Sequence, residues 1–427
     1  MKRLHPRWYF VALAVALVLP GLRVLTWAGP RVIAVEAAAV ETGKMLFEHE
    51  WKVNDPLSGG DGLGPVFNAK SCVACHGSPS IGGASGKEHN VTMYTILPPQ
   101  PGGAIRQGVV HASAVDRKYR ESLIQVDPRL PDESHPTFGP MGNRGGRALF
   151  GFGFSIPTNI VLSQRNTPAL YGAKWIDEIP DRVIVAQEKK QHLQWGLAPA
   201  SSEQLPVGRA LRLPDGRVGK FGWKAQSASL LEFVQAACAN ELGLSNPTQP
   251  QPNPIGQPQY VAKGVDLTAE QCQQMTDFLY ALARPVQKAP ADATARSSAD
   301  AGQALFHQIG CADCHTPNLG SIDGLYSDLL LHRMGLDLQG GGFYYGSPTP
   351  IPTSVASTLP MADEWRTPPL WGVADSAPYL HDGRANTLDE AITLHGGQGE
   401  RSAIAYGRLS QQQREQVVAF LKTLRAP

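Results

Sequence analysis

Net charge and cysteine are both scarce in this sequence of 427 residues. The 38 Lys and Arg residues are offset by 37 Asp and Glu residues, so the formal net charge is +1. Such a balanced chain gives no sign of the basic surface that binds nucleic acid, nor of strong electrostatic steering toward a charged partner. The acidic residues also form no cluster that would predict a calcium site, so calcium is not among the predicted cofactors.

Four of the six cysteines fall into two copies of Cys-x-x-Cys-His, at residues 72–76 (CVACH) and 311–315 (CADCH). This pattern attaches a c-type haem: each thiol adds to one vinyl group, and the adjacent histidine binds the iron. A zinc site or a redox dithiol also uses Cys-x-x-Cys, but zinc would need a second pair of ligands, which is missing at both places. The sequence therefore predicts two covalently bound haem c groups, attached through Cys72, Cys75, Cys311 and Cys314, with His76 and His315 as proximal iron ligands.

The remaining cysteines, Cys238 and Cys272, allow two interpretations. They could form a disulfide in an exported protein, or they could be two buried free thiols. Sequence does not give their separation, so both alternatives stay open.

The N-terminus predicts the compartment. Basic residues within the first seven positions precede an apolar stretch at 8–20 (WYFVALAVALVLP). A short apolar segment after a basic start is typical of a secretory signal. Arg23 and Arg31 interrupt any cleavage site that would follow at once, so an uncleaved membrane anchor is the alternative for residues 1–30. Either alternative predicts a protein exported to the periplasm.

Glycine (44 residues) and proline (35 residues) are abundant, which predicts a mainly α-helical protein with long irregular loops. A diverged internal repeat runs through it. Phe67 and Phe306 each lie five residues before the first cysteine of a motif, and residues 167–172 (TPALYG) resemble residues 367–372 (TPPLWG). We expect two copies of one kind of domain.

The repeat is clearest at its end, where residues 267–285 and 409–427 share the same spacing of apolar residues and a final proline. Both segments open with a capping box, Thr268 with Gln271 and Ser410 with Gln413, before an apolar stripe at helical period. They resemble the closing helices of cytochrome c-like domains, in which that helix packs across the helix holding the haem attachment site.

The predicted organisation is a signal or anchor at 1–30, a first cytochrome c-like domain at 40–285 and a second at 301–427. Residues 286–300 are rich in proline, alanine and serine and are predicted to be a linker. The first domain is about twice as long as the second, and the excess lies between Cys75 and Leu267. This insertion is expected to set substrate access and specificity.

These motifs resemble the bacterial di-haem oxidoreductases, which are relatives of di-haem cytochrome c peroxidase and of the di-haem enzyme that matures the tryptophylquinone of methylamine dehydrogenase. The resemblance implies reduction of hydrogen peroxide, with electrons from a small donor such as a cytochrome or a cupredoxin. It makes the C-terminal haem the electron-transfer centre and the N-terminal haem the reactive one, and calcium is often held between the domains of such proteins. The matching stretches are 62–77, 165–181, 219–225, 241–247, 326–335, 364–372 and 379–397.

The resemblance also places a distal ligand of the second haem fourteen residues after the histidine of a His-Asp-Gly motif. Here the motif begins at His381, and the position fourteen residues later is His395. Met334 is the alternative ligand. A cytochrome c fold takes this ligand from the loop before the closing helix, which favours His395. His381 itself is expected to be a supporting residue near the haem edge.

For the reactive haem, the resemblance points to Glu241 as a distal acid, which would move a proton between the two peroxide oxygens. The alternative is a solvated glutamate near a helix end capped by Gly243. The glutamine usual in the peroxidases is absent, since Leu231 occupies its position, and this departure puts peroxidase efficiency in doubt. A distal histidine for this haem would be His89 or His111, which are otherwise surface residues.

The related enzymes place a tryptophan between the haems, but the matching stretch here, residues 179–182 (IPDR), has none. Trp223 either takes that place or is an ordinary core aromatic. Two other functions compete with a peroxidase. They are a non-enzymatic di-haem electron carrier and an oxidase that modifies a partner protein.

Overall fold

The computed structural model describes residues 36–98, 103–131, 156–196, 204–341, 351–352 and 359–427. The predicted signal or anchor at 1–30 lies outside these residues. Within them, no helix is both long and apolar enough to cross a membrane. Residues 35–427 form one compact unit, so the division into two domains stays a prediction.

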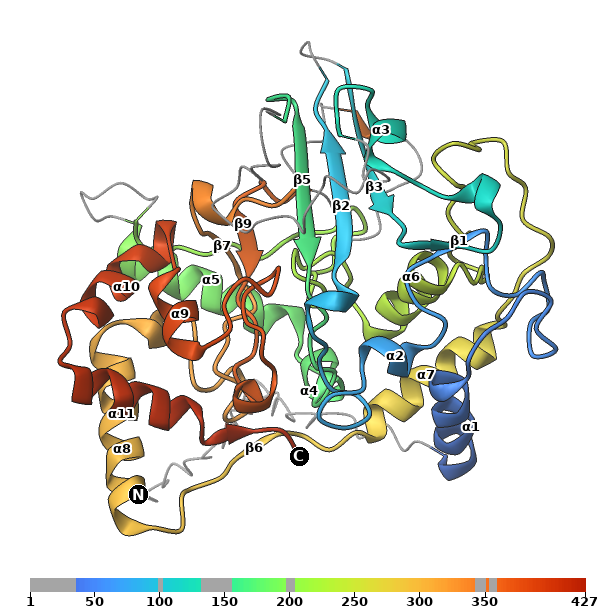
Figure 1. Ribbon diagram of the computed structural model, residues 1–427. Coiled ribbons are helices and arrows are strands. Elements are labelled where there is room, and N and C mark those ends of the chain that lie inside the picture. The colour runs from blue at the N-terminus through green and yellow to red at the C-terminus, as the bar shows by residue number, and fades with distance from the viewer. Residues whose placement is uncertain (1–35, 99–102, 132–155, 197–203, 342–350, 353–358) are drawn as a thin grey trace, which may run out of the picture. The chain divides into compact units, whose positions relative to one another are not determined.

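Two helices cross at a glycine beside the first attachment segment. They are α1 (Ala37–Glu48) and α7 (Ala269–Ala281), which lie side by side in Figure 1. A Cβ atom at Gly43 would lie 1.8 Å from the carbonyl oxygen of Gln274, so only glycine allows this approach. Phe47, one turn further along α1, packs on Phe278 at 5.3 Å between ring centroids. The predicted capping box at the start of α7 is confirmed.

The second copy repeats this crossing with α8 (Ala293–Gln308) and α11 (Gln411–Leu421) (Figure 1). A Cβ at Gly302 would lie 1.8 Å from the carbonyl oxygen of Gln416, and Phe306 packs on Phe420 at 5.3 Å. The predicted capping box before α11 is also confirmed. The two closing helices are therefore equivalent in three dimensions as well as in sequence.

The structure corrects the first part of the proposed repeat. The counterpart of Phe306 is Phe47, because each ring lies between a closing helix and the histidine of an attachment motif. Phe67 instead lies in the short strand β1 (Val66–Phe67). We call α1 and α8 the opening helices of the two copies. The connection from the opening helix to the Cys-x-x-Cys-His motif is longer in the first copy, so the five-residue spacing identified the wrong phenylalanine there.

The closing helices also pack differently from expectation. They contact the helix that precedes each attachment segment, and the segments themselves are short: α2 (Cys72–Cys75) and the 3₁₀ helix η3 (Cys311–Asp313). The predicted linker is shorter than 286–300, since α8 begins at Ala293 and its Ala299 is buried. Before it, β6 (Val286–Gln287) pairs with β10 (Leu424–Arg425) at the end of the chain.

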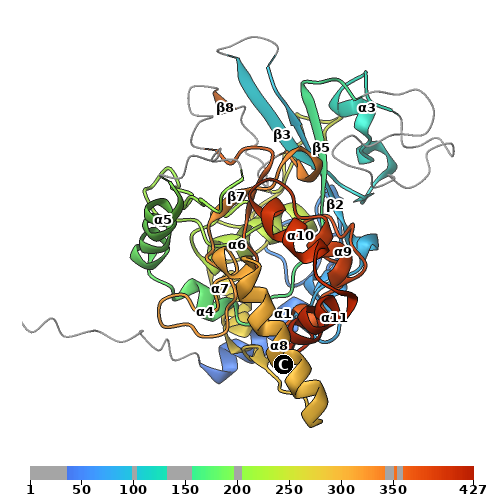
Figure 2. The ribbon, with the colours of Figure 1, turned by 90° about the vertical axis from the view of Figure 1, so that its left-hand side faces the viewer.

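Three strands of the insertion and one short strand from the C-terminal half form an antiparallel sheet that the mainly α prediction missed. Its strand order is β5 (Ile160–Arg165), β2 (Val91–Ile96), β3 (Ala104–Val110) and β8 (Ile351–Pro352). Figure 2 shows β2, β3 and β5 running together away from the helices. Ile96, Val110 and Ile160 pack with α3 (Leu123–Val126) into a core of their own. The fold is therefore mixed rather than mainly α.

Five helices and two strands complete the frame of the site. They are α4 (Ala173–Asp177), α5 (Asp181–Trp195), α6 (Leu230–Leu242), α9 (Leu388–Thr393), α10 (Glu400–Gly407), β7 (Leu331–Arg333) and β9 (Glu364–Arg366). The strands β7 and β9 pair with each other as an antiparallel ribbon. The largest hydrophobic core surrounds the first attachment segment, and a second core lies between α8, α11 and the second segment.

Candidate haem sites

Both attachment segments form one tight turn that brings the cysteines and the histidine together. In each, the backbone N–H of the histidine donates to the carbonyl of the first cysteine, at 2.9 Å for His76 and 3.0 Å for His315. Burial raises the pKa of the thiols of Cys72, Cys75 and Cys311 to about 12. Free thiols with such a pKa are protonated at neutral pH, which disfavours a reactive dithiol at these positions.

A cavity of about 800 Å³ opens beside the second segment. Its lining includes the second attachment motif and both of the distal ligands predicted for it: Cys311, Cys314, His315, Met334 and His395. The structure thus brings together residues that are up to 84 positions apart in the sequence. A site of this size with mostly apolar walls suits a large planar cofactor.

Two imidazole rings in this cavity are spaced to hold one metal ion between them. The ring centroids of His315 and His395 are 6.4 Å apart, and the rings are inclined by 64°. Metal–imidazole nitrogen bonds of about 2 Å, with each ring centre lying ~1 Å behind its nitrogen, would separate the centroids by roughly 6 Å. The residues present therefore fit a haem iron bound on both sides by histidine.

The protonation of these rings suits the same role. Nδ1 of His315 bonds the carbonyl of Tyr326 at 3.0 Å, and Nδ1 of His395 bonds that of Ala391 at 2.7 Å. Each carbonyl fixes the proton on Nδ1 and leaves the lone pair of Nε2 available to a metal ion. Burial lowers the pKa of His315 to about 4 and also lowers the pKa of His395. Both rings are thus neutral at physiological pH.

Met334 lies next to His395. A Cβ at Gly399 would be 3.1 Å both from the Met334 methyl carbon and from the Cβ of His395. Both predicted distal candidates therefore line the cavity, and the ring spacing just described supports His395.

At the first segment, Nδ1 of His76 bonds the carbonyl of Gly83 at 3.3 Å, and burial lowers the pKa of this histidine to about 4. Its ring neighbour is Phe47 at 6.3 Å, matching Phe306 beside His315 at 6.5 Å. Among the residues that the structure describes, His76 has an aromatic contact with Phe47 but none with a second imidazole. The two sites therefore share their proximal side and differ on the other.

Glu241 lies near the first attachment segment, in the last turn of α6. Its Oε2 accepts a hydrogen bond from the Asn68 side-chain amide at 2.7 Å. Burial, with this carboxylate nearby, raises the pKa of Cys75. Gly243 caps the helix in a left-handed conformation with φ of 63°. Glu241 thus lies near the first attachment segment, as a distal acid would, and also at a glycine-capped helix end, as the alternative predicted.

His111 is neither a surface residue nor an available ligand. It is buried; its Nδ1 contacts Glu121 at 2.9 Å and its Nε2 contacts the carbonyl of Asn240 at 2.9 Å. Both ring nitrogens are therefore used within the fold. His89 lies in the short 3₁₀ helix at Lys87–His89 and does not line the cavity just described.

Trp223 lines the cavity and joins the two copies of the Thr-Pro repeat. Its indole N–H donates to the carbonyl of Asn166 at 2.9 Å, and its own carbonyl accepts from the N–H of Arg366 at 2.9 Å. Asn166 and Arg366 directly precede the two repeat segments. The repeats also touch directly, since a Cβ at Gly172 would lie 2.7 Å from the Trp371 ring.

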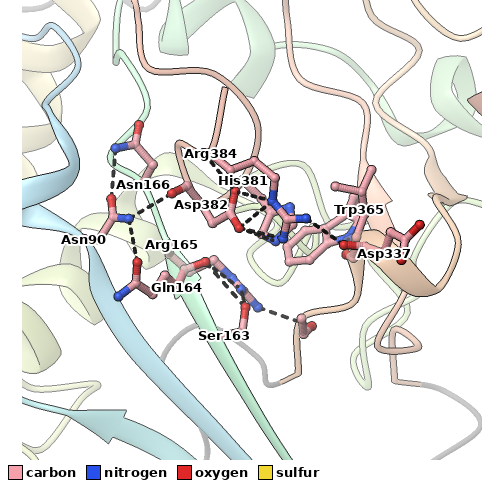
Figure 3. A network of polar contacts seen from close by, with 12 residues as sticks. Asn90, Ser163, Gln164, Arg165, Asn166, Asp337, Trp365, His381, Asp382 and Arg384 are labelled. Atoms are coloured by element: carbon pink, nitrogen blue, oxygen red, sulfur yellow. Dashed lines mark hydrogen bonds and ion pairs between the residues drawn. The ribbon is translucent and has the colours of Figure 1, made fainter. Parts of the chain in front are cut away.

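His381 stacks on an aromatic residue that sequence reasoning did not single out. Its ring lies 3.8 Å from that of Trp365, at 14° between planes (Figure 3). Lys224 lies 3.7 Å and Arg165 4.5 Å from the Trp365 ring. Burial, together with nearby cations that include Arg165 and Arg384, holds the pKa of His381 well below its usual range. Trp365 and Lys224 fall within the stretches 364–372 and 219–225, so those motifs contained the signal.

The loop that carries His381 is tied to the sheet. The His381 carbonyl accepts from the Asn166 N–H at 2.7 Å, and the Asp382 carbonyl accepts from Asn90 at 2.9 Å (Figure 3). Arg384 pairs with the Asp382 carboxylate at 2.7 Å.

The remaining cysteines, Cys238 and Cys272, are two buried free thiols rather than a disulfide.

Residues 160–424 match the model of the family described as "Di-haem oxidoreductase, putative peroxidase". The chain belongs to this di-haem oxidoreductase family. Membership makes it an oxidoreductase that uses haem, in agreement with the two attachment motifs and the histidine pair.

Curated relatives of this di-haem oxidoreductase match over part of their length. One is the methylamine utilization protein MauG of Methylorubrum extorquens, 31% identical over 137 residues, which are 30% of this chain and 35% of MauG. Another is cytochrome-c peroxidase IdrP2 of a Pseudomonas species, 30% identical over 160 residues, 32% of this chain and 42% of the relative. The matches span less than half of these relatives.

Two solved structures are similar to this chain over most of its length. One is a MauG-like protein associated with microbial copper homeostasis, with 15% identity, coverage of 93% of this chain and 92% of the other, and a TM-score of 0.39. The second is the dihaem peroxidase BthA of Burkholderia thailandensis, with 15% identity, coverage of 92% and 87%, and a TM-score of 0.39.

Proposed function

We propose that this protein is a periplasmic di-haem c-type peroxidase, with haems covalently attached at Cys72/Cys75 and Cys311/Cys314. Hydrogen peroxide is the proposed substrate, and a small cytochrome or cupredoxin is the proposed electron donor, with electrons passing from the C-terminal to the N-terminal haem. When bound, the haems supply the redox chemistry, and the protein's residues decide which iron is closed to ligands. The spacing of His315 and His395 is the observation that carries the proposal.

His315 and His395 close the second site from both sides. His315 and His395 would hold the iron between two imidazoles, and an iron so held would supply electron transfer at a lower potential than one bound by histidine and methionine. The backbone bonds from Tyr326 and Ala391 hold both rings in place. The second site thereby suits electron transfer.

His76 supports an open site. Its aromatic contact among the described residues is Phe47, so the second imidazole seen beside His315 has no counterpart in those contacts. A ligand such as peroxide needs an open coordination position, which a second imidazole would close. The first site is thus the one proposed to react.

Glu241 is the proposed proton carrier at the first site. Cleaving the O–O bond of peroxide requires a proton to move from the inner to the outer oxygen, which a positioned carboxylate can carry. The amide of Asn68 holds Oε2 of Glu241, and the Glu241 carbonyl accepts from the backbone N–H groups of Asn68 at 2.8 Å and Ala69 at 3.2 Å, just before the attachment segment. Asn68 orients the carboxylate, and Glu241 would hold and release the proton.

The match to MauG favours a second candidate, an oxidase that modifies a partner protein. Both enzymatic functions need an open iron, whereas a simple electron carrier has two closed ones. Absorption and EPR spectra of the purified oxidised and half-reduced protein, with and without peroxide or cyanide, separate these classes. We expect one low-spin haem whose spectrum does not change with peroxide or cyanide, and one high-spin haem that binds either ligand. Two low-spin haems that respond to neither ligand would make the protein a carrier.

A further inference from the structure

Arg366 reaches the cavity of the second site from the end of β9. Its backbone is fixed by the bond to the Trp223 carbonyl, and its Nε donates to the carbonyl of Gly222 at 2.8 Å. The residue lines the same cavity as His315 and His395. The guanidinium is therefore held in place at Nε, which leaves its two terminal nitrogens, Nη1 and Nη2, as the donors that can reach into the cavity.

One of these nitrogens is buried without a partner. Nη1 of Arg366 has no hydrogen-bond partner among the residues that the structure describes. A buried charged donor left unpaired costs several kcal/mol or more, so such groups are normally matched by an anion. Burial lowers the pKa of Arg366 to about 10, against the influence of Asp328, which raises it. The site therefore contains a cation that still needs an acceptor.

Asp328 is already committed to other donors. Its Oδ2 accepts from His332 and from the Gln191 amide, both at 2.8 Å, and its Oδ1 accepts from the Leu330 N–H at 2.9 Å. Its carboxylate thus acts on Arg366 through space, with no hydrogen bond between the two in the structure. An acceptor bound in the cavity would satisfy this unpaired nitrogen.

Other arginines near the cavity differ from Arg366. Arg165 donates to backbone carbonyls, including that of Gly341 at 2.7 Å, and Arg384 pairs with Asp382. A second arginine, Arg401, also lines the cavity and lies 5.7 Å from the Trp195 ring, but it is Arg366 whose buried Nη1 lacks a partner among the described residues.

We propose that Arg366 binds a propionate group of the haem attached at Cys311 and Cys314. The proposal rests on the covalent attachment proposed above. A haem carries two propionate carboxylates, and the planar guanidinium fork matches a carboxylate with two parallel hydrogen bonds. The Nε bond to Gly222 fixes the plane of the fork before the haem enters, so little side-chain freedom is lost on binding.

The pairing has a consequence for the iron. A propionate balanced by Arg366 no longer places an uncompensated negative charge beside the haem, and this favours the reduced iron. Removing the guanidinium restores that negative charge and favours the oxidised iron. The reduction potential of the second haem therefore reports on the pair, independently of turnover.

The test is spectroelectrochemical titration of the haem-loaded wild type, Arg366→Gln and Arg366→Lys. In Arg366→Gln we expect the ratio of reduced to oxidised second haem at a fixed potential to fall at least tenfold, which is about 59 mV for a one-electron couple. Arg366→Lys keeps the charge without the fork and should shift the ratio less. Arg212→Gln removes the same charge from a half-exposed residue paired with Glu188 and should leave the ratio unchanged.

Haem content separates the outcomes. If the wild type carries no covalent haem, the proposed function fails, whatever Arg366 does. If Arg366→Gln carries two haems and its second-haem potential equals that of the wild type, the propionate pair is wrong and the proposed function stands. If Arg366→Gln does not fold, a crystal structure of the haem-loaded wild type decides. An Nη nitrogen about 2.7–2.9 Å from a propionate oxygen supports the pair, and a guanidinium turned onto Asp328 overturns it.

Discussion

At the scale of single residues, three histidines share one hydrogen-bonding pattern. Each donates Nδ1–H to a backbone carbonyl and so presents Nε2 to its site. Because the acceptor is a backbone carbonyl, no second side chain is needed to orient the ring. The local turn fixes the ring orientation before any metal binds. The pairs are His76 with Gly83, His315 with Tyr326 and His395 with Ala391.

The first prediction concerns His395. Replacing it in His395→Gly should convert the second haem from low spin to high spin, because the iron loses one of its two imidazoles. EPR of the oxidised protein measures the change. Met334→Leu is the matched control, since Met334 lies beside His395 in the same cavity, and this variant should stay low-spin. A low-spin His395→Gly together with a high-spin Met334→Leu would make Met334 the ligand.

The second prediction concerns Glu241. Glu241→Gln should lower peroxide turnover by roughly 10²–10⁴-fold with unchanged haem spectra, because the amide cannot carry the proton. Glu88→Gln is the control: the exposed Glu88 also raises the pKa of Cys75 through its charge, and its loss should leave turnover intact. Full turnover in Glu241→Gln would remove this residue from the mechanism.

At the scale of elements, each copy depends on one helix crossing. The glycines Gly43 and Gly302 let the opening helix touch the backbone of the closing helix, and Phe47 and Phe306 fill the space beside each attachment histidine. The crossing sets the position of the phenylalanine, and the phenylalanine packs against the histidine. The position of each attachment histidine therefore depends on the contact between the two helices.

The third prediction tests that contact. Gly302→Ala should destabilise the protein by about 1–3 kcal/mol, as overpacking does, because its Cβ would meet the Gln416 carbonyl. Thermal unfolding followed by circular dichroism measures the loss. At Gly407 in α10 a Cβ would have nothing within 4 Å, so Gly407→Ala should unfold at or slightly above the wild-type temperature. Equal melting temperatures for the two variants would contradict the proposed crossing.

The fourth prediction concerns the ribbon of β7 and β9. Burial raises the pKa of Glu364, but hydrogen bonds from Arg209 and from the Met361 N–H outweigh it, so the folded-state pKa lies below the ordinary value of 4.5. A lowered pKa stabilises the fold above that value, and the stabilisation is lost as the pH falls through the folded-state pKa. The melting temperature of Glu364→Gln should therefore lie below that of the wild type at neutral pH and approach it in acid.

The control for this pH series is Glu50→Gln, because the side chain of Glu50 is 66% exposed and its contact with Lys70 is loose at 3.7 Å. Its melting temperature should follow the wild type throughout. A gap between Glu364→Gln and the wild type that stays constant down to acid pH would show that the carboxylate charge contributes nothing to stability.

At the scale of the whole molecule, the sequence predicted the parts whose chemistry is local. Both capping boxes and the repeat of 167–172 in 367–372 follow from short spacings and are found in the structure, whereas haem attachment at the two Cys-x-x-Cys-His motifs stays a prediction. The opening helix of the first copy was missed, because a long connection separates Phe47 from Cys72 and removes the spacing seen in the second copy. The side-chain stack of His381 and Trp365 depends on tertiary contacts that no local pattern encodes.

The sheet was missed for another reason. Residues 91–96 (VTMYTI) alternate between buried and half-buried positions over most of their length, which is a strand signal. The abundance of glycine and proline favoured irregular loops in the same region. Pairing with β5, whose residues come about 70 positions later, is what stabilises the strand. The glycine and proline content correctly predicted irregular loops in the insertion, but it gave no sign of the β-sheet between them.

The fifth prediction tests the central claim, two covalently bound haems in one chain, and it follows from the state of all six cysteines. Four of them should be blocked as thioethers, and Cys238 and Cys272 are buried free thiols. Mass spectrometry of the exported protein, denatured without reductant and treated with an alkylating agent, counts both at once. We predict a mass equal to the processed chain plus two haems and two alkyl groups. A chain without haem and with six alkylated cysteines would contradict the account.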